Sequence, residues 1–395
     1  MNMSKSKIIN FEWMCDHNHY THEQFDKIKT DLIKKDIDQA IDENVDTVVG
    51  LYLMDGFLQP KYRYKEFILH LNEIKDYAYN AGIKKIILIS GHGETLDNCP
   101  FEYLFLDFNL RLLINSYPDL NVLPKFNPEN TKFLFLTGMP NRPNRIGLLS
   151  KYYDKDLLDT AEWSFFGPWT PMDQSWCREY LKHYSDEHYN TFLINCERSF
   201  DNRYETCKPF YGSYTSTENA PLWYDVVNID WVQLPSHIDS KVYSDTLFSV
   251  ISEGPNFWSE DWSFITEKTW RTFLHRHPFI FAGHPDQFRY IKKLGFKTFE
   301  EYLLIKDYAY IEDENERLDA VVKNTEYLLK NIKNNLDAIE KDVEYNYQMY
   351  FNHVNNQDKI FKFLKHDLNV SSDDIQPYAN IKGYPYLIRR IPDGF

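Results

Sequence analysis

The chain has 395 residues, of which 43% are hydrophobic and 17% aromatic, and its formal net charge is −15 at pH 7. This hydrophobic content excludes general disorder, and the length predicts two domains rather than a single core. The negative charge argues against a surface built to bind nucleic acid or anionic membranes, although a local basic cleft remains compatible with it.

The N-terminal segment MNMSKSKIINFEW lacks the apolar core of a signal peptide, and no run of about 18 apolar residues predicts a membrane span. The cysteines show no tight pairing pattern, which suits free thiols in a reducing compartment. They are Cys15, Cys99, Cys177, Cys196 and Cys207. We therefore expect a cytoplasmic protein without membrane insertion. The sequence does not predict its oligomeric state.

The first third of the chain alternates strand and helix signals. Apolar runs predict strands over residues 7–13, 47–53 and 85–90. Helical spacing predicts helices over residues 25–43 and 67–81. This alternation predicts a parallel sheet in an α/β domain, in which ligands bind at the carboxyl ends of the strands.

A second α/β domain is predicted after an Asn- and Pro-rich linker over residues 121–131. The run KFLFLT (132–137) predicts its first strand, which the loop GMPNRPN and a helix from Arg145 follow. Residues 160–240 are dense in Trp, Tyr, Pro and Cys, and they predict a loop-rich insertion with short strands such as 191–195.

Residues 248–299 predict one β–loop–α–β unit, with strands over 248–251 and 278–281 and a helix that opens at the sequence FITEK. Apolar residues at helical spacing over 316–351 predict one or two long amphipathic helices. The predicted fold class is α/β, with two Rossmann-like domains facing a cleft and C-terminal helices. The predicted parts are an acceptor-side domain (1–128), a donor domain (129–345) and a helical tail (346–395).

The tripeptide Thr266-Glu267-Lys268 stands at the predicted start of a helix, where phosphates are readily held. Thr266 suits the N-cap, and an ordinary capped helix is one interpretation. The other is a ligand site, in which Lys268 neutralises a diphosphate and Glu267 accepts hydrogen bonds from ribose or sugar hydroxyls. Arg142 and Arg145, after the strand at 132–137, are either solvated loop charges or further anion-binding groups.

These segments, in this order, resemble the nucleotide-sugar-binding domain of the α-1,3-fucosyltransferase family and its phage-encoded glycosyltransferase relatives. That domain begins with a strand, an Asn/Pro/Arg loop and a helix, here KFLFLTGMPNRPNRIGLLS. It later has a strand that ends in an acidic residue (FSVISE, ending at Glu253), a Thr-Glu-Lys helix start (FITEKTW) and a Pro-led strand with a Gly turn (HPFIFAGHP). The resemblance covers residues 130–310 and is tightest over 250–300.

The resemblance implies a two-domain GT-B architecture and an inverting, metal-independent transfer of a sugar from a nucleotide-sugar donor. It does not carry over the identity of the donor; we expect a UDP- or GDP-linked sugar and no other cofactor. It implies that Glu267 and Lys268 contact the donor and that the catalytic base is a carboxylate of the N-terminal domain. Together with the residues argued from the sequence, the predicted donor-binding residues are Arg142, Arg145, Glu253, Thr266, Glu267 and Lys268. The acceptor is either a DNA base, as in phage DNA modification, or a glycan.

The chemistry also follows from the residues themselves. Displacement at an anomeric carbon needs a base for the acceptor hydroxyl and charge stabilisation for the departing diphosphate. Lys268, Arg145 and Arg142 supply positive charge without a metal. The candidate bases Asp55, His92 and Glu94 follow predicted strands of the first domain. We favour Glu94, because the glycines of GHGE permit close approach of the backbone to a ligand, while an ordinary turn is the competing interpretation.

Two other functions remain open at this point. A metal-dependent hydrolase would use His92, Glu94 and a cluster after the first strand, namely Cys15, Asp16, His17, His19 and His22. A non-catalytic protein would bind the nucleotide sugar or a glycan without turnover. Asp154 and Asp156 form an Asp-x-Asp pair, but their context KYYDKDLLD indicates helix or turn surface rather than a metal site. No Walker, dinucleotide-binding or nucleophile-elbow motif is present.

Overall fold

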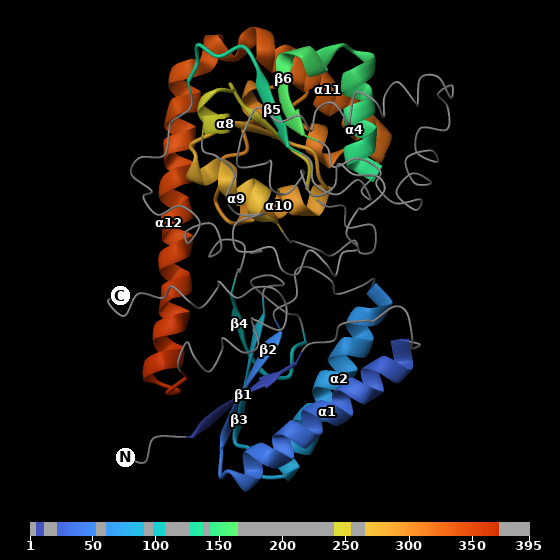
Figure 1. Cartoon of the computed structure of the whole chain (residues 1–395), viewed down its shortest axis with the longest axis vertical. Coiled ribbons are helices and arrows are strands. Elements are labelled where there is room, and N and C mark those ends of the chain that lie inside the picture. The colour runs from blue at the N-terminus through green and yellow to red at the C-terminus, as the bar shows by residue number, and fades with distance from the viewer. Residues whose placement is uncertain are drawn as a thin grey trace, which may run out of the picture. The chain divides into compact units, whose positions relative to one another are not determined.

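The protein is described by a computed structural model that covers residues 5–11, 22–52, 61–90, 98–106, 127–136, 143–164, 241–253 and 265–370. The chain forms two compact units (Figure 1). Unit 1 contains Met1–Asn115, Phe257–Phe264 and Asn352–Phe395, and unit 2 contains Ser116–Asn256 and Ile265–Phe351. Each unit is built around one parallel sheet and is described by itself.

Unit 1 contains a sheet of four parallel strands in the order β1-β2-β3-β4. The strands are β1 (Ser6–Asn10), β2 (Thr47–Tyr52), β3 (Lys85–Ser90) and β4 (Glu102–Phe105). Helices α1 (His22–Asp42) and α2 (Lys61–Asn80) connect the first three strands. Parallel neighbours need such crossover connections, because the chain must return to the same end of the sheet before each new strand.

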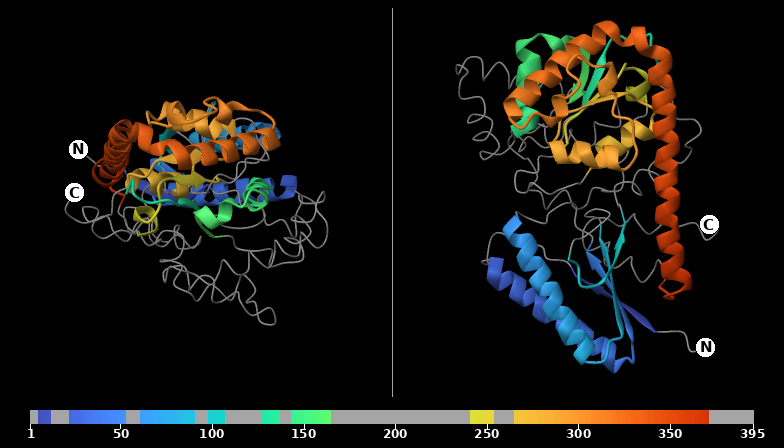
Figure 2. Two further views of the ribbon diagram at one scale, coloured as in Figure 1. Left: turned by 90° about the horizontal axis from the view of Figure 1, so that it is seen from above. Right: turned by 180° about the vertical axis from the view of Figure 1, so that it is seen from behind.

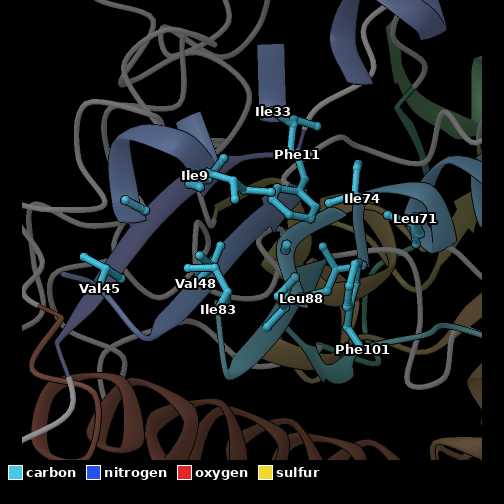
Figure 3. Packing of buried hydrophobic residues seen from close by; sticks show 14 residues of the cluster. Ile9, Phe11, Ile33, Val45, Val48, Leu71, Ile74, Ile83, Leu88 and Phe101 are labelled. Atoms are coloured by element: carbon cyan, nitrogen blue, oxygen red, sulfur yellow. The ribbon is translucent and has the colours of Figure 1, made fainter. Parts of the chain in front are cut away.

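The first sheet is buried on both faces, and alternate residues of each strand serve opposite faces. Ile9, Val48 and Leu88 pack with apolar side chains of α1 and α2 (Figure 3). The register pairs Ile8 with Val49 and Val49 with Ile87, and these residues pack on the other face. This explains why the strands read as continuous apolar runs rather than as an alternation of apolar and polar residues.

Unit 2 contains a second sheet of four parallel strands in the order β6-β5-β7-β8. The strands are β5 (Phe133–Leu136), β6 (Ala161–Ser164), β7 (Ser249–Ile251) and β8 (Phe279–Phe281). The described α-helices of unit 2 before residue 332 are α4 (Pro143–Asp154), α8 (Lys241–Ser244), α9 (Glu267–Leu274), α10 (Pro285–Lys293) and α11 (Glu314–Asn331). Short 3-10 turns are η2 (Leu157–Thr160), η5 (Glu300–Tyr302), η6 (Tyr308–Tyr310) and η7 (Ile332–Asn335).

Aromatic side chains form much of the core of unit 2. Phe133 and Phe135, two residues apart on β5, both contact the ring of Tyr152 on α4, with centroids 5.2 Å away in each case. The Tyr152 hydroxyl lies 2.8 Å from the Thr325 hydroxyl on α11, so a buried polar atom is satisfied within the core. Leu134 packs instead with Val242 and Tyr243, as the period of a strand requires.

The last described helix, α12 (Leu336–His366), is continuous and contributes to both units (Figure 2). In unit 2, Tyr350 packs edge-on against Trp270 of α9, and the Arg276 guanidinium stacks 3.4 Å from the Tyr347 ring centroid. In unit 1, Leu364 and Leu368 join the apolar cluster on the second face of the first sheet. The end of α12 therefore covers the face that α1 and α2 leave open.

The structure confirms the predicted fold class of an α/β protein with two Rossmann-like parallel sheets and a long C-terminal helix. The predicted helical region over 316–351 is two helices, α11 and α12, with η7 between them. The α4 helix begins at Pro143 rather than Arg145, because proline suits the first turn of a helix, where its missing N–H is not needed. Asp154 ends α4, and Asp156 takes a left-handed conformation before η2. The predicted strand 191–195 lies outside the described residues.

No helix within the described ranges is long and apolar enough to span a membrane.

Replacing Leu364 with alanine tests the cover of the first sheet by α12. Leu364 is only 1% exposed, so the change should lower the free energy of unfolding of unit 1 by about 2–5 kcal/mol. Urea unfolding measures the loss of stability. Amide hydrogen exchange in β1, β2 and β3 shows whether the loss lies in unit 1. Leu69→Ala is the control, because Leu69 is a 67% exposed leucine of the same unit. Equal stability of the two variants would contradict the assigned packing.

Candidate functional site

The strand order of the second sheet reverses between β5 and β7. The chain passes from β5 to β6 on one side, and β7 then pairs with β5 on the other side. In open parallel sheets, ligands bind outside the carboxyl ends of the strands at such a reversal, because the two flanking loops diverge there. The loops after β5 and β7 lead to α4 and α9, so the beginnings of these helices define the candidate site.

Helix α9 begins as the sequence predicts. Thr266 is the N-cap, with extended backbone angles (φ −99°, ψ −179°), and its Oγ1 accepts a hydrogen bond from the Lys268 N–H at 3.3 Å. Glu267 lies in the first turn, where a negative charge is favoured by the helix dipole. The capped-helix interpretation is thus confirmed, and it leaves the ligand-site interpretation open, because both use the same geometry.

The Glu253 carboxylate anchors the start of α9. Glu253 follows β7 and is fully buried. Its Oε1 accepts hydrogen bonds from the Thr266 N–H at 3.0 Å and from the Thr269 hydroxyl at 2.5 Å, and its Oε2 accepts one from the Thr266 hydroxyl at 2.7 Å. A buried carboxylate needs such donors to offset its lost hydration. These bonds give Glu253 a role in holding the helix.

Glu267 and Lys268 pair with each other at the start of α9. The Lys268 Nζ lies 2.9 Å from Glu267 Oε1, and the side chains are 20% and 17% exposed, respectively. Burial alone raises the pKa of Glu267, but the charges of Lys268 and Arg271 outweigh it and bring the pKa down to about 2. Glu267 is therefore an ionised, acceptor-only group throughout the physiological pH range.

The start of α4 is joined to the ends of two strands. The Asn144 Nδ2 donates to the backbone oxygen of Glu253 at 2.9 Å and to that of Ala282 at 3.2 Å. Arg145 follows directly and is also buried. Arg145 and the Thr266–Lys268 segment thus stand at the beginnings of the two helices that follow β5 and β7. Figure 1 labels both helices, α4 and α9.

Helix α10 begins beside the same edge, after β8. His284 is its N-cap, and a reciprocal capping box joins His284 to Gln287. A Cβ atom on Gly283 would approach the Phe281 ring to 2.5 Å and Gln287 Oε1 to 2.7 Å, so only glycine fits without displacement. The sequence patterns predict no site role for Asn144, His284 or Gln287. The His-Pro-x-Gln spacing was the signal for the α10 cap, with proline at the first helical position.

Several predicted site residues lie outside the described residues. They are Asp55, His92, Glu94, Arg142, Cys15, Asp16, His17 and His19. His22 opens α1, and its side chain is also outside the described set. Among the residues that the structure describes, no group of three or more His, Cys, Asp or Glu side chains is placed to hold a metal ion.

No known protein family, curated protein or solved structure matches this chain. The geometry of the site itself therefore carries the functional argument.

Two buried histidines, His275 and His277, lie between α9 and β8 in the chain. His277 Nδ1 lies 2.8 Å from the Ser249 hydroxyl, and its Nε2 lies 3.1 Å from the backbone oxygen of Thr246. The His275 ring stacks on Tyr243 at 4.1 Å. The Ser249–His277 contact resembles a nucleophile and its base, but both residues are buried at the amino ends of β7 and β8, opposite the ligand edge. We interpret it as a structural hydrogen bond.

These histidines predict a loss of stability in acid. Burial lowers the pKa of His277 to about 4 and that of His275 to about 3. Between the ordinary value of about 6.5 and these values, the unfolded chain binds protons that the folded chain does not. Stability therefore falls as pH falls through this window, by up to about 1.4 kcal/mol per pH unit for each histidine.

Urea unfolding at several pH values between about 7 and 5 checks this expectation. His277→Asn should reduce the slope of stability against pH without abolishing it, because His275 remains. Asn355→Ala, which removes no titratable group from an exposed position of α12, is the control and should leave the slope unchanged. The role of His277 would be refuted if stability changed with pH equally steeply in the unchanged protein, in the His277→Asn variant and in the control variant.

Proposed function

We propose that the protein is a glycosyltransferase that moves a sugar from a nucleotide-sugar donor to an acceptor hydroxyl. The observation that carries the proposal is the placement of Arg145 and Lys268 at the starts of α4 and α9, the helices that follow the two strands flanking the reversal of the second sheet. Helix beginnings and basic side chains at such a reversal favour a phosphate-bearing ligand.

The pairing of Lys268 with Glu267 supports a donor that carries both a diphosphate and a sugar. A diphosphate arriving at the start of α9 replaces the Glu267 carboxylate as the partner of the Lys268 ammonium. Glu267 then becomes available to accept hydrogen bonds from ribose or sugar hydroxyls. Both groups of the ion pair would thus exchange one hydrogen-bonding partner for another.

The proposed reaction is a single displacement at the anomeric carbon. The base takes the proton of the acceptor hydroxyl, the oxygen bonds to the anomeric carbon, and the bond from that carbon to the diphosphate oxygen breaks. The electron pair leaves with the nucleoside diphosphate, whose charge Lys268, Arg145 and the α9 amino end stabilise without a metal. Glu94 remains our choice of base, ahead of His92 and Asp55, and inversion is the stereochemical outcome expected of such a displacement.

The donor is proposed to be a UDP- or GDP-linked sugar. For the acceptor, a DNA base and a glycan are the two proposed classes. The net charge of −15 favours the glycan, because DNA binding relies on a basic surface.

Binding of GDP and UDP tests the donor site. Titration calorimetry in the presence of a chelator should show that at least one of them binds. Lys268→Ala should weaken that binding by about 10–100-fold, which corresponds to the loss of one charge-assisted hydrogen bond. Lys323→Ala, at an exposed position of α11 in the same unit, should bind as the unchanged protein does.

Absence of binding by both nucleotides would overturn the proposed function, and binding that requires a divalent metal would favour the hydrolase alternative. Release of sugar from UDP- or GDP-sugars, with and without acceptors, then separates an enzyme from a binding protein. A protein that binds the donor but never turns it over would be a nucleotide-sugar-binding protein.

A further inference from the structure

The Asn144 side chain connects three segments of unit 2. It is the second residue of α4 and only 3% exposed. Its Nδ2 donates to backbone oxygens at the ends of β7 and β8, those of Glu253 and Ala282, and lies 3.4 Å from the Ser252 hydroxyl. One amide group therefore fixes the beginning of α4 against the carboxyl ends of two strands.

The orientation of this amide is determined by its surroundings. The two carbonyl oxygens can only accept hydrogen bonds, so the side chain must turn its NH₂ group towards them. Its Oδ1 is buried and has no hydrogen-bond partner among the residues that the structure describes. The described contacts of Asn144 therefore all run through its NH₂ group, towards the ends of β7 and β8.

Two other buried asparagines of unit 2 show the contrast. Asn324 and Asn346 each use both ends of the amide, donating to one backbone oxygen and accepting from the N–H of the same residue. The partner is Ile305 for Asn324 and Lys297 for Asn346. These two are satisfied structural bridges, whereas Asn144 adjoins Arg145 and contacts the residue whose carboxylate anchors α9.

We propose that Asn144 is a positioning residue of the donor site, which holds Arg145 at the ends of β7 and β8 in the orientation that a diphosphate requires. This inference rests on the proposed function. It assigns no contact between Asn144 and the ligand, so Asn144 should act only through Arg145.

A double-mutant comparison tests the proposal with GDP and UDP as probes. For whichever nucleotide the unchanged protein binds, Arg145→Gln and Asn144→Ala should each weaken binding about tenfold. The protein with both changes should be weakened about tenfold as well, rather than about a hundredfold, because one change already removes what the other positions. Fully additive losses, or an Asn144→Ala protein with unchanged affinity, would overturn the inference.

Asn324→Ala is the matched control, because it removes a buried asparagine bridge from the same unit. It should lower the melting temperature but leave the affinity for the nucleotide unchanged. An equal loss of affinity in Asn324→Ala would show that general destabilisation explains the Asn144 effect, and would overturn the inference. If Asn144→Ala does not fold, Asn144→Ser, which keeps a hydroxyl donor, is measured in its place and should show a smaller loss that is likewise non-additive with Arg145→Gln.

The proposed function and this inference fail separately. Failure of the unchanged protein to bind GDP or UDP removes the donor site itself. Normal binding by the unchanged protein, with no specific effect of Asn144, removes only the positioning role.

Discussion

Glu253 is the residue on which the geometry of the candidate site depends. Its carboxylate accepts three hydrogen bonds at the start of α9, while its backbone oxygen accepts one from Asn144 at the start of α4. A buried carboxylate is tolerated only when donors surround it, so the beginning of α9 cannot move away without leaving a charge uncompensated. Glu253, at the end of β7, therefore fixes the beginnings of α4 and α9 relative to each other. Arg145 lies at the beginning of α4, and Lys268 lies at the beginning of α9.

In this arrangement the Glu253 carboxylate holds the helix, whereas Glu267 and Lys268 can change partners. Glu253 is committed to Thr266 and Thr269, which leaves Glu267 and Lys268 as a partly exposed pair. The pair is satisfied in the absence of a ligand and can be satisfied again by a diphosphate and a hydroxyl group. A site of this kind avoids the cost of a bare buried charge in both states, and it explains why an acid and a base stand side by side at a helix beginning.

The sequence predicts best what depends on neighbouring residues. The apolar runs of β2, β3 and β7, and the Thr266 cap of α9, are local patterns, and they appear in the structure where the patterns place them. The four-residue strands β4 and β6 were not predicted, because their sequences EYLF and AEWS become strands only through pairing with β3 and β5. The role of Glu253 depends on partners 13 or more residues away, and the role of Asn144 depends on partners 108 or more residues away. The cover of the first sheet by the end of α12 is equally non-local.

The central claim is that a nucleoside diphosphate binds at the beginnings of α4 and α9. Hydrogen exchange followed by mass spectrometry, with and without saturating GDP or UDP, tests it most directly, because bound phosphate protects the amides that it contacts. We expect the amides of residues 144–146 and 266–269 to exchange more slowly when the nucleotide is bound, and the exchange rates in α11 to stay unchanged. Binding that slows exchange elsewhere in the chain, while both of these segments exchange as before, would contradict it.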